Sequence, residues 1–200
     1  MAVVQIPNLP AAIALSGTEQ LEIVQAGVSC RTTTQAVANL PSTPLTALKT
    51  YGSFISSVTQ TNTGPTAVRL MYFDTTPVAS SGVTLASNGT NLSRMTVAYT
   101  GVYNIMFSAQ IITSSGGSQS AFIWLRINGS NVAVSNTEFS IAKNNANLVA
   151  AWNWMVPMTA GQYVEIAWES ADANLTLVHS ASPTYGPAIP SVIATINAVG

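Results

Sequence analysis

The hydrophobic pattern of residues 121–135 (AFIWLRINGSNVAVS) predicts two strands joined by a two-residue turn at Asn128-Gly129. A half-buried strand alternates apolar with polar side chains. The first of these two strands has no polar face, because only Arg126 is charged and apolar residues fall on both sides: Phe122 and Trp124 on one, Ala121, Ile123, Leu125 and Ile127 on the other. The pattern indicates that something covers both faces of this strand.

Short apolar segments separated by turn residues continue from residue 66 to the C-terminus, with no helical period between them. Ten such segments predict an antiparallel two-sheet sandwich, so we expect residues 66–200 to form one all-β domain. The expected strands are 67–73, 82–86, 92–100, 101–112, 121–127, 131–137, 147–158, 163–170, 174–180 and 189–199.

Residues 1–40 have a different pattern, which predicts a small β and short-helix module. The expected elements are a strand at Leu21, Ile23 and Val24, a turn at Ala26-Gly27, a strand at 28–31 and a Thr-capped helix at 32–39. This segment is too short to hold a core alone, so we expect it to dock on another structure. Residues 41–65 are rich in Pro, Ser, Thr and Gly, and predict a linker with one structured contact near Phe54.

The chain carries very little charge. Six Lys and Arg and seven Asp and Glu residues make up 6% of the 200 residues, against a usual value of about 25%. No apolar run reaches the roughly 18 residues of a membrane-spanning helix, and a chain with 48% hydrophobic residues is not a disordered one. An outer-membrane barrel would need aromatic girdles on many matched strands. An assembly that hides subunit surface is therefore the favoured explanation.

Charge also bears on partners and location. The net charge is −1 and the basic residues are spread singly, so no nucleic-acid surface is expected. The N-terminal sequence MAVVQIPNLP has neither the basic region nor the apolar run of a signal peptide, which argues against export through a membrane.

Few residues offer catalytic or metal-binding chemistry. One histidine, His179, and one cysteine, Cys30, cannot form a His and Cys metal site within one chain, and Cys30 has no neighbouring base in the sequence. Glu165 and Glu169 share a strand face, but about 13 Å separates their Cα atoms, against about 5 to 9.5 Å between the carboxyl groups of a glycosidase pair. We expect no enzyme activity and no cofactor.

Aromatic residues are the remaining candidates for binding. Trp152 and Trp154 share a strand face with Ala150 and Val156, which favours packing in the core or an interface over a sugar-binding platform. Trp168 lies in the expected neighbouring strand. The candidate core or subunit-interface residues are Phe122, Trp124, Trp152, Trp154 and Trp168.

The order of motifs resembles a known superfamily. The segments TGVYNIMFSAQI, FIWLRINGSNVAVS, WMVPMTAGQYVEIAWES, NLTLVHS and PSVIATINAV follow one another as in the jelly roll of the tumour necrosis factor and complement globular-head superfamily. The resemblance covers roughly residues 66–200, and Gly101-Val102-Tyr103, residues 125–129 and Ala160-Gly161 are its best points. It implies a homotrimer, in which a neighbouring subunit covers the second face of the 122–127 strand.

The first segment resembles a different group of proteins. The run SGTE, VQ, GV and RTT in LSGTEQLEIVQAGVSCRTTTQAVANL is similar to the short N-terminal attachment module of many tailed-bacteriophage virion proteins. The resemblance implies a location on the exterior of the phage particle and a partner such as the major capsid protein. The candidate attachment residues are Leu21, Ile23, Val24 and Val28.

Two functions follow from these resemblances. The first is structural: a trimeric capsid decoration protein, either a cement protein or a head fibre. The second is recognition: a short tail fibre whose loops bind a host surface glycan or protein. A fold alone does not separate them, whereas the copy number per virion would.

Overall fold

The computed structural model describes residues 16, 18–38, 50–65, 67–142 and 146–199. The chain divides into two compact units, Met1–Thr43 and Pro44–Gly200. Residues 41–49 of the linker expected at 41–65 lie outside the described residues.

The first unit is a β-hairpin followed by one helical turn. Strands β1 (Gln20–Gln25) and β2 (Val28–Thr33) pair antiparallel, and α1 (Thr34–Ala38) follows directly. Ala26 and Gly27 both have positive φ, 53° and 80°, as a two-residue hairpin turn requires. The Thr33 hydroxyl accepts a hydrogen bond from the backbone N of Ala36 at 3.0 Å and caps the helix. The expected strands, turn and Thr cap are confirmed, but the helix begins at Thr34 and not at Thr32, because Thr32 and Thr33 pair with β1.

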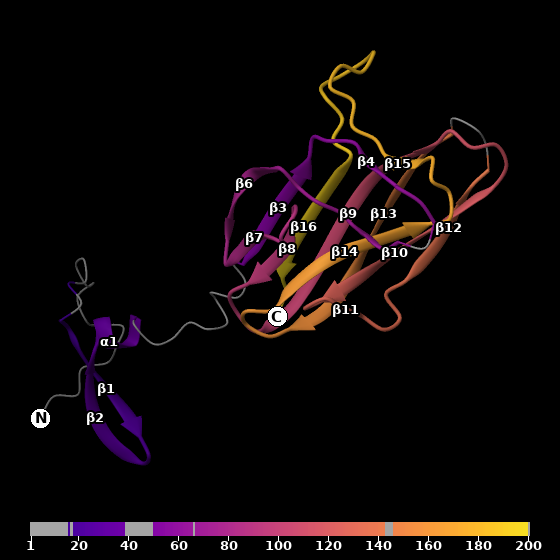
Figure 1. The fold of residues 1–200 in the computed structure, drawn as a ribbon. Coiled ribbons are helices and arrows are strands. Elements are labelled where there is room, and N and C mark those ends of the chain that lie inside the picture. Colours follow the sequence, from indigo (N-terminus) through magenta and orange to yellow (C-terminus); the bar gives the residue numbers. More distant parts are fainter. Residues whose placement is uncertain (1–15, 17, 39–49, 66, 143–145, 200) are drawn as a thin grey trace, which may run out of the picture. The chain divides into compact units, whose positions relative to one another are not determined.

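The second unit is an antiparallel two-sheet sandwich, as the strand pattern predicted, with the jelly-roll fold that the resemblance implied (Figure 1). Sheet I has the order β11-β10-β14-β8-β7, with β12 pairing with β10 and β5 with β14. Its strands are β5 (Arg69–Leu70), β7 (Val83–Ser87), β8 (Leu92–Val97), β10 (Gln119–Ile127), β11 (Ser130–Asn131), β12 (Thr137–Ile141) and β14 (Tyr163–Ser170).

Sheet II has the order β4-β15-β9-β16-β3-β6, with β13 pairing with the free side of β9. Its strands are β3 (Tyr51–Ser56), β4 (Gln60–Thr61), β6 (Thr75–Ser81), β9 (Gly101–Thr113), β13 (Ala146–Met158), β15 (Leu175–Leu177) and β16 (Val192–Ala198).

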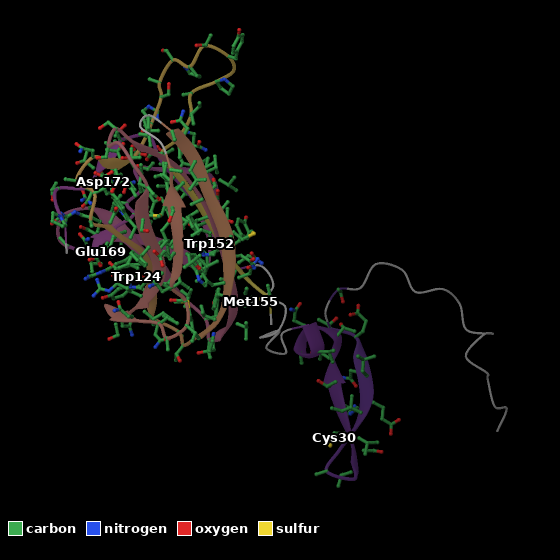
Figure 2. All side chains as sticks on the ribbon, turned by 90° about the vertical axis from the view of Figure 1, so that its right-hand side faces the viewer. Cys30, Trp124, Trp152, Met155, Glu169 and Asp172 are labelled. Atoms are coloured by element: carbon green, nitrogen blue, oxygen red, sulfur yellow. The ribbon has the colours of Figure 1, made fainter. Side chains whose placement is uncertain are left out.

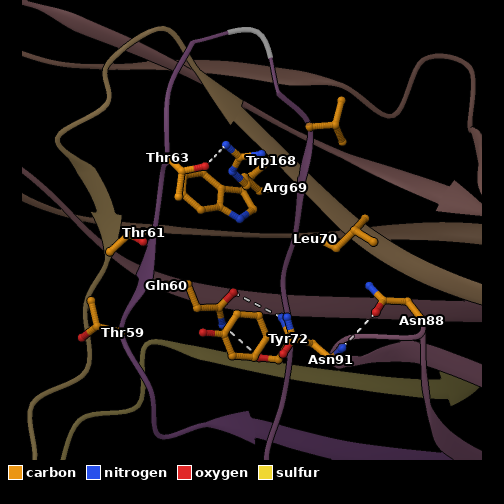
Figure 3. A pocket seen from close by; sticks show the side chains of 11 residues that line it. Thr59, Gln60, Thr61, Thr63, Arg69, Leu70, Tyr72, Asn88, Asn91 and Trp168 are labelled. Carbon is orange, nitrogen blue, oxygen red and sulfur yellow. Dashed lines mark hydrogen bonds between the residues drawn. The ribbon is translucent and has the colours of Figure 1, made fainter.

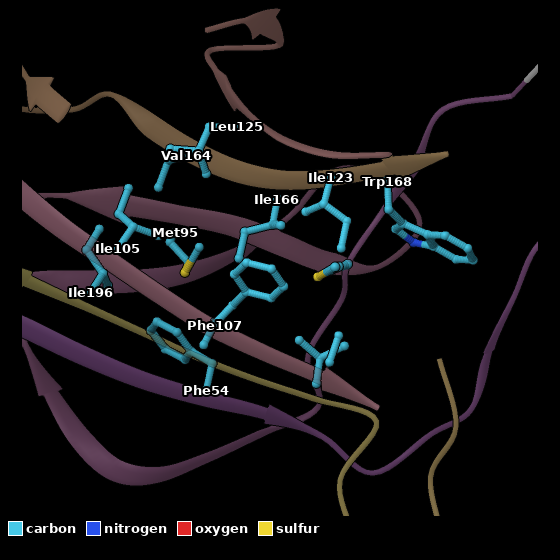
Figure 4. Packing of buried hydrophobic residues seen from close by; sticks show 14 of the residues in the cluster. Phe54, Met95, Ile105, Phe107, Ile123, Leu125, Val164, Ile166, Trp168 and Ile196 are labelled. Atoms are coloured by element: carbon cyan, nitrogen blue, oxygen red, sulfur yellow. The ribbon is translucent and has the colours of Figure 1, made fainter. Parts of the chain in front are cut away.

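The core lies between the two sheets and follows the period-2 alternation of their strands (Figure 4). In β9, Tyr103, Ile105, Phe107, Ala109 and Ile111 are buried, and the residues between them are not. In β10, the inward side chains are Ala121, Ile123 and Leu125, as expected. Asn128 and Gly129 form the predicted turn with φ values of 49° and 80°.

Four parts of the prediction are wrong. Strand β6 (Thr75–Ser81) lies where no strand was expected. Strands β3 and β4 lie in the stretch expected to be a linker, and β3 pairs with β16 and β6 while its Phe54 is buried. The expected strand 131–137 is interrupted at 132–136, because the chain turns away after Asn131 and re-enters sheet I at Thr137 as β12, beside the first half of β10. In the segment expected at 67–73 only Arg69–Leu70 is a strand, although Met71 and Phe73 are buried.

Candidate functional site

The outer face of sheet II carries no charge. None of the seven strands of this sheet contains Asp, Glu, Lys, Arg or His. Apolar side chains on this side stand in water, with Met155 61% and Val149 55% exposed. We define the uncharged face as the outward residues Tyr51, Val102, Asn104, Met106, Val149, Asn153, Met155, Ile193 and Thr195.

These residues form one continuous surface across four strands. The register places Asn153 opposite Met106 and Met155 opposite Asn104 on β13 and β9, and Thr195 of β16 on the other side of Met106. The Asn153 side-chain amide donates to Asn104 Oδ1 at 2.9 Å. Figure 2 shows Met155 on this side of the sandwich and Glu169 on the opposite side. A large uncharged surface with exposed apolar groups is typical of an interaction site.

Strand β13 adds an open backbone edge to this surface. It pairs with β9 over its whole length of 13 residues, and with no other described strand. A long edge strand presents unpaired N–H and C=O groups that readily pair with another chain, and charged residues usually protect such edges. Only Pro157, near the end of β13, interrupts the row of N–H groups.

The outer face of sheet I has charged residues that find partners within the chain. Glu165 is only 2% exposed, accepts a hydrogen bond from Ser93 Oγ at 2.9 Å and lies 3.5 Å from Arg94 Nε. The Arg94 guanidinium lies over the Tyr163 ring, 4.5 Å from its centroid. Arg126 stands opposite Glu165 in the sheet register. The charges of this face are therefore largely neutralised by neighbours.

Trp124 and Phe122 lie on this outer face of sheet I. Trp124 is 7% exposed, and its Nε1 donates to Asn131 Oδ1 at 2.8 Å. Together with Val132 and Glu169, the two aromatic rings line a groove, and Phe122 is half-buried there. The turn after β10 thus covers Trp124 within one chain, and no neighbouring subunit is needed to hide it.

The other three candidate tryptophans face the interior. Trp154 stacks on Phe107 with 5.2 Å between ring centroids, and Trp152 meets the same Phe107 edge-on at 4.7 Å. Trp154 Nε1 donates to the carbonyl of Ser135 at 2.9 Å, which joins the edge of sheet II to the loop before β12. Trp168 is 2% exposed and belongs to the core. Trp152 and Trp154 share the inward side of β13 with Ala150 and Val156, the arrangement expected from the sequence.

The candidate attachment residues are all exposed on the hairpin. Leu21, Ile23 and Val28 share one side of the hairpin with Cys30, which pairs with Ile23 in the register. Val24, 73% exposed, lies on the other side. Glu19 fixes the start of the hairpin, because its carboxylate accepts hydrogen bonds from Ser16 and from Thr34 Oγ1, and these bonds lower its pKa. The hairpin thus presents apolar side chains on a framework tied together by polar contacts.

Within the part of the chain that the structure describes, His179, Cys30 and the Glu165–Glu169 pair lie in separate places. His179 Nδ1 is bonded to the carbonyl of Ile189 at 2.8 Å, and Cys30 lies on the hairpin. Glu165 and Glu169 share the outer face of β14, but Glu165 pairs with Arg94 while Glu169 borders the groove at Phe122. Among the described residues, no three His, Cys, Asp or Glu side chains gather closely enough to hold a metal ion.

Asp172 links the ends of the two sheets. Its carboxylate accepts hydrogen bonds from Thr113 Oγ1 at the end of β9, from Ser115 Oγ at 2.7 Å and from the backbone N of Asn174 at 2.9 Å. Burial alone would raise the pKa of this carboxyl, but the hydrogen bonds outweigh it and lower the pKa below its ordinary value of 3.8. Its role is structural.

Comparison with known proteins adds a likeness in fold. The globular domain of the zebrafish complement 1qA protein matches with 12% sequence identity and a TM-score of 0.45, over 76% of this chain and 98% of that chain. No protein-family model and no curated protein matches the sequence. In the described part of the chain, no helix has the length and apolar character needed to cross a membrane. The jelly-roll assignment rests on the strand order and register given above.

Proposed function

We propose that this chain is a structural subunit of a phage virion: a homotrimeric decoration protein, held on the outside of the particle by its N-terminal hairpin. The observation that carries the proposal is the uncharged face of sheet II with its open β13 edge. A surface of this kind loses little polar solvation when it is buried, and gains about 25 cal/mol for each Å² of apolar area removed from water.

In the proposed trimer, three copies form a closed ring and each copy buries its uncharged face against its neighbours. In a closed ring every copy buries the same surface, so no uncharged face is left to recruit further chains. The number three comes from the resemblance of residues 66–200 to trimeric jelly-roll heads. The outer face of sheet I, with its internally paired charges, then forms the exterior of the assembly.

Attachment is the role of the hairpin. Two strands alone do not make a stable core, and Leu21, Ile23 and Val28 gather their apolar side chains on one side. The partner is a virion protein such as the major capsid protein. The likeness of this segment to phage attachment modules supports that choice. A short tail fibre is the second candidate, and counting copies per virion separates the two: hundreds for decoration and about a dozen for a tail fibre.

A lysine on the uncharged face tests the assembly. In the Met155→Lys variant, three copies would bury unpaired ammonium groups, and we expect the trimer to dissociate to folded monomers at micromolar concentration, with a loss of about 2 to 5 kcal/mol in association free energy. Native mass spectrometry and light scattering report the oligomeric state. Thr84→Lys is the matched control, because Thr84 is an exposed neutral residue on the outer face of sheet I. A wild-type monomer, or a trimer that both lysines leave intact, contradicts the proposal.

A further inference from the structure

A hollow of about 420 Å³ opens between β4 of sheet II and β5 of sheet I. Figure 3 shows residues of β4 on one side, residues of β5 and its continuation on the other, and Trp168 between them. Its volume lies within the range of small-molecule sites, about 300 to 1,000 Å³. No sequence pattern indicates this hollow, because its walls come from residues 59–72, 88–91 and Trp168.

The walls of the hollow are fixed by a side chain that bridges the two strands. Gln60 Nε2 donates to the carbonyl of Tyr72 at 2.9 Å, and Gln60 Oε1 accepts from the backbone N of Tyr72 at 3.2 Å. Gln60 Nε2 also donates to Ser56 Oγ at 3.1 Å. Because the Gln60 amide is fully used in this way, it shapes the site and leaves binding to its neighbours.

Two buried donors at the hollow lack an acceptor among the described residues. They are Trp168 Nε1 and Arg69 Nε. The Trp168 side chain is only 2% exposed. Arg69 is its cross-strand neighbour, and Arg69 Nη2 donates a hydrogen bond to Thr63 Oγ1. Buried donors are nearly always satisfied. Trp124 and Trp154 meet this rule with partners inside the chain. Trp152 Nε1 also lacks a partner among the described residues, but Trp152 does not line the hollow. A ligand that brings an acceptor to these two atoms would satisfy both donors.

The other groups around the hollow are hydroxyls and amides. They include Thr61, Tyr72, Asn88 and Asn91, and no acidic side chain lines the space. Burial, and then the charge of Asp74, raise the pKa of Tyr72, so its phenol stays a neutral donor. Asp74 itself accepts hydrogen bonds from Ser57. A cationic ligand would find no partner here, whereas an anion with hydroxyl groups would.

We propose that this hollow binds the carboxylate-bearing ring of an acidic saccharide of the hexuronic acid type. The carboxylate accepts hydrogen bonds from Arg69 and from Trp168 Nε1, and the ring hydroxyls exchange hydrogen bonds with Tyr72 and Asn91. The site goes beyond the proposed assembly role and does not depend on it, because all its groups come from one chain. The subunit would then bind an acidic saccharide at its surface.

Titration of the full-length, ¹⁵N-labelled protein with D-glucuronic acid tests the site. The four tryptophans give four indole N–H signals in a proton–nitrogen NMR spectrum, and we expect the Trp168 signal to shift saturably with a millimolar dissociation constant. D-Glucose has the same ring without the carboxylate and should bind at least about tenfold more weakly, because it loses the charge-assisted hydrogen bonds. Signals of Trp124 and Trp154, whose indoles have partners in the chain, should stay in place.

Two arginine variants separate the site from a general charge effect. Arg69→Met should weaken glucuronate binding at least about tenfold, whereas Arg31→Met, which removes the same charge from the hairpin unit, should bind as the wild type does. Trp168→Phe identifies the signal, and sequential assignment identifies it if that variant does not fold. A Trp168 signal that does not move, equal binding of glucose, or equal losses in the two arginine variants would overturn the proposal, and none of these results bears on the oligomeric state.

Discussion

The two outer faces of the sandwich differ in where the chain places its few charges. Sheet I carries Arg94, Arg126, Glu138, Glu165 and Glu169 on its outer side, whereas the strands of sheet II carry none. A low overall charge could have meant a surface that is weakly charged everywhere. The chain instead concentrates charge on one sheet and leaves the other bare.

The two faces differ in what they need from their surroundings: the outer face of sheet I is suited to water, and that of sheet II to contact with another chain. On sheet I, buried Glu165 is held by Ser93 and Arg94, so this face meets water without an external partner. On sheet II, Met155 and Val149 stand exposed with no charged neighbour in the sheet. The same alternation that builds a common core therefore gives the two sheets different outer chemistry, and the comparison can be tested from both sides.

The largest effect is expected from shortening the chain into sheet II. A protein of residues 44–200 keeps β3 and should fold and assemble, whereas one of residues 60–200 loses it. Without β3, strand β16 has an open side and Phe54, now 1% exposed, is missing from the core. Loss of a buried Phe side chain alone costs about 3 to 5 kcal/mol, and the lost strand adds to this, so residues 60–200 should not fold. Circular dichroism and thermal melting of both proteins check this.

The longer protein also tests the division between the two units. If residues 44–200 form the trimer but no longer bind particles, the hairpin is the anchor. Normal binding of residues 44–200 to particles would move the anchor onto the sandwich. A folded 60–200 protein would show that sheet II does not need β3.

The next effect concerns a large side chain on the charged side. Trp124→Ala should lower the free energy of unfolding by about 3 to 5 kcal/mol, the usual loss for a buried tryptophan, and leave the oligomeric state unchanged, because Trp124 lies on the face opposite β13. Denaturant melts and light scattering measure the two quantities. Asn131→Ala removes only the acceptor of the indole N–H and should cost about 1 kcal/mol. Dissociation of the Trp124→Ala trimer would place the interface on sheet I.

Local signals in the sequence were enough for much of the fold. Ala26-Gly27 and Asn128-Gly129 each place a glycine at the end of an apolar run, and both form tight hairpin turns. The expected strand 101–112 is β9, and every second residue from Tyr103 to Ile111 is buried in it. These features depend on neighbours in the sequence, so a single chain shows them.

The missed elements depend on contacts from distant parts of the chain. Strand β3 lies among Pro, Ser and Thr residues and contributes one large buried side chain, Phe54, which pairs with Ala194 of β16 in the register and has the ring of Phe73 beside it. The expected strand 131–137 is interrupted near Ser135. The Ser135 hydroxyl accepts the hydrogen bond from the backbone N–H of Leu125, which a backbone carbonyl would accept in a regular strand pair. Turn chemistry and pairing registers of this kind are set by tertiary structure.

Of the candidate surfaces, the uncharged face had a sequence signal and the saccharide site had almost none. The outward positions of 147–157 alternate with Trp152 and Trp154 and contain no charge, so the pattern could have identified the face. The hollow needs Gln60, Arg69 and Trp168 from three separate strands. Only the isolated charge of Arg69 within an apolar run marked its place.

The smallest expected effect is at the seam between the two sheets, and it depends on pH. The pKa of Asp172 is lower in the folded protein than its ordinary value of 3.8, so the ionised carboxylate stabilises the fold above that pH, and the stabilisation is lost as the pH falls through the folded-state pKa. Asp172→Asn should therefore cost about 1 to 3 kcal/mol at pH 7, and the difference from wild type should shrink in acid below pH 3.8. Urea unfolding of both proteins at pH 7 and below pH 3.8 measures the difference in the free energy of unfolding. Glu138→Gln, on an exposed side chain of β12, should change the stability by less than about 0.5 kcal/mol at either pH. If the cost of Asp172→Asn stays constant with pH, the hydrogen bonds to Thr113 and Ser115 stabilise the fold only through their geometry. The negative charge of Asp172 would then contribute nothing to stability where the two sheets meet.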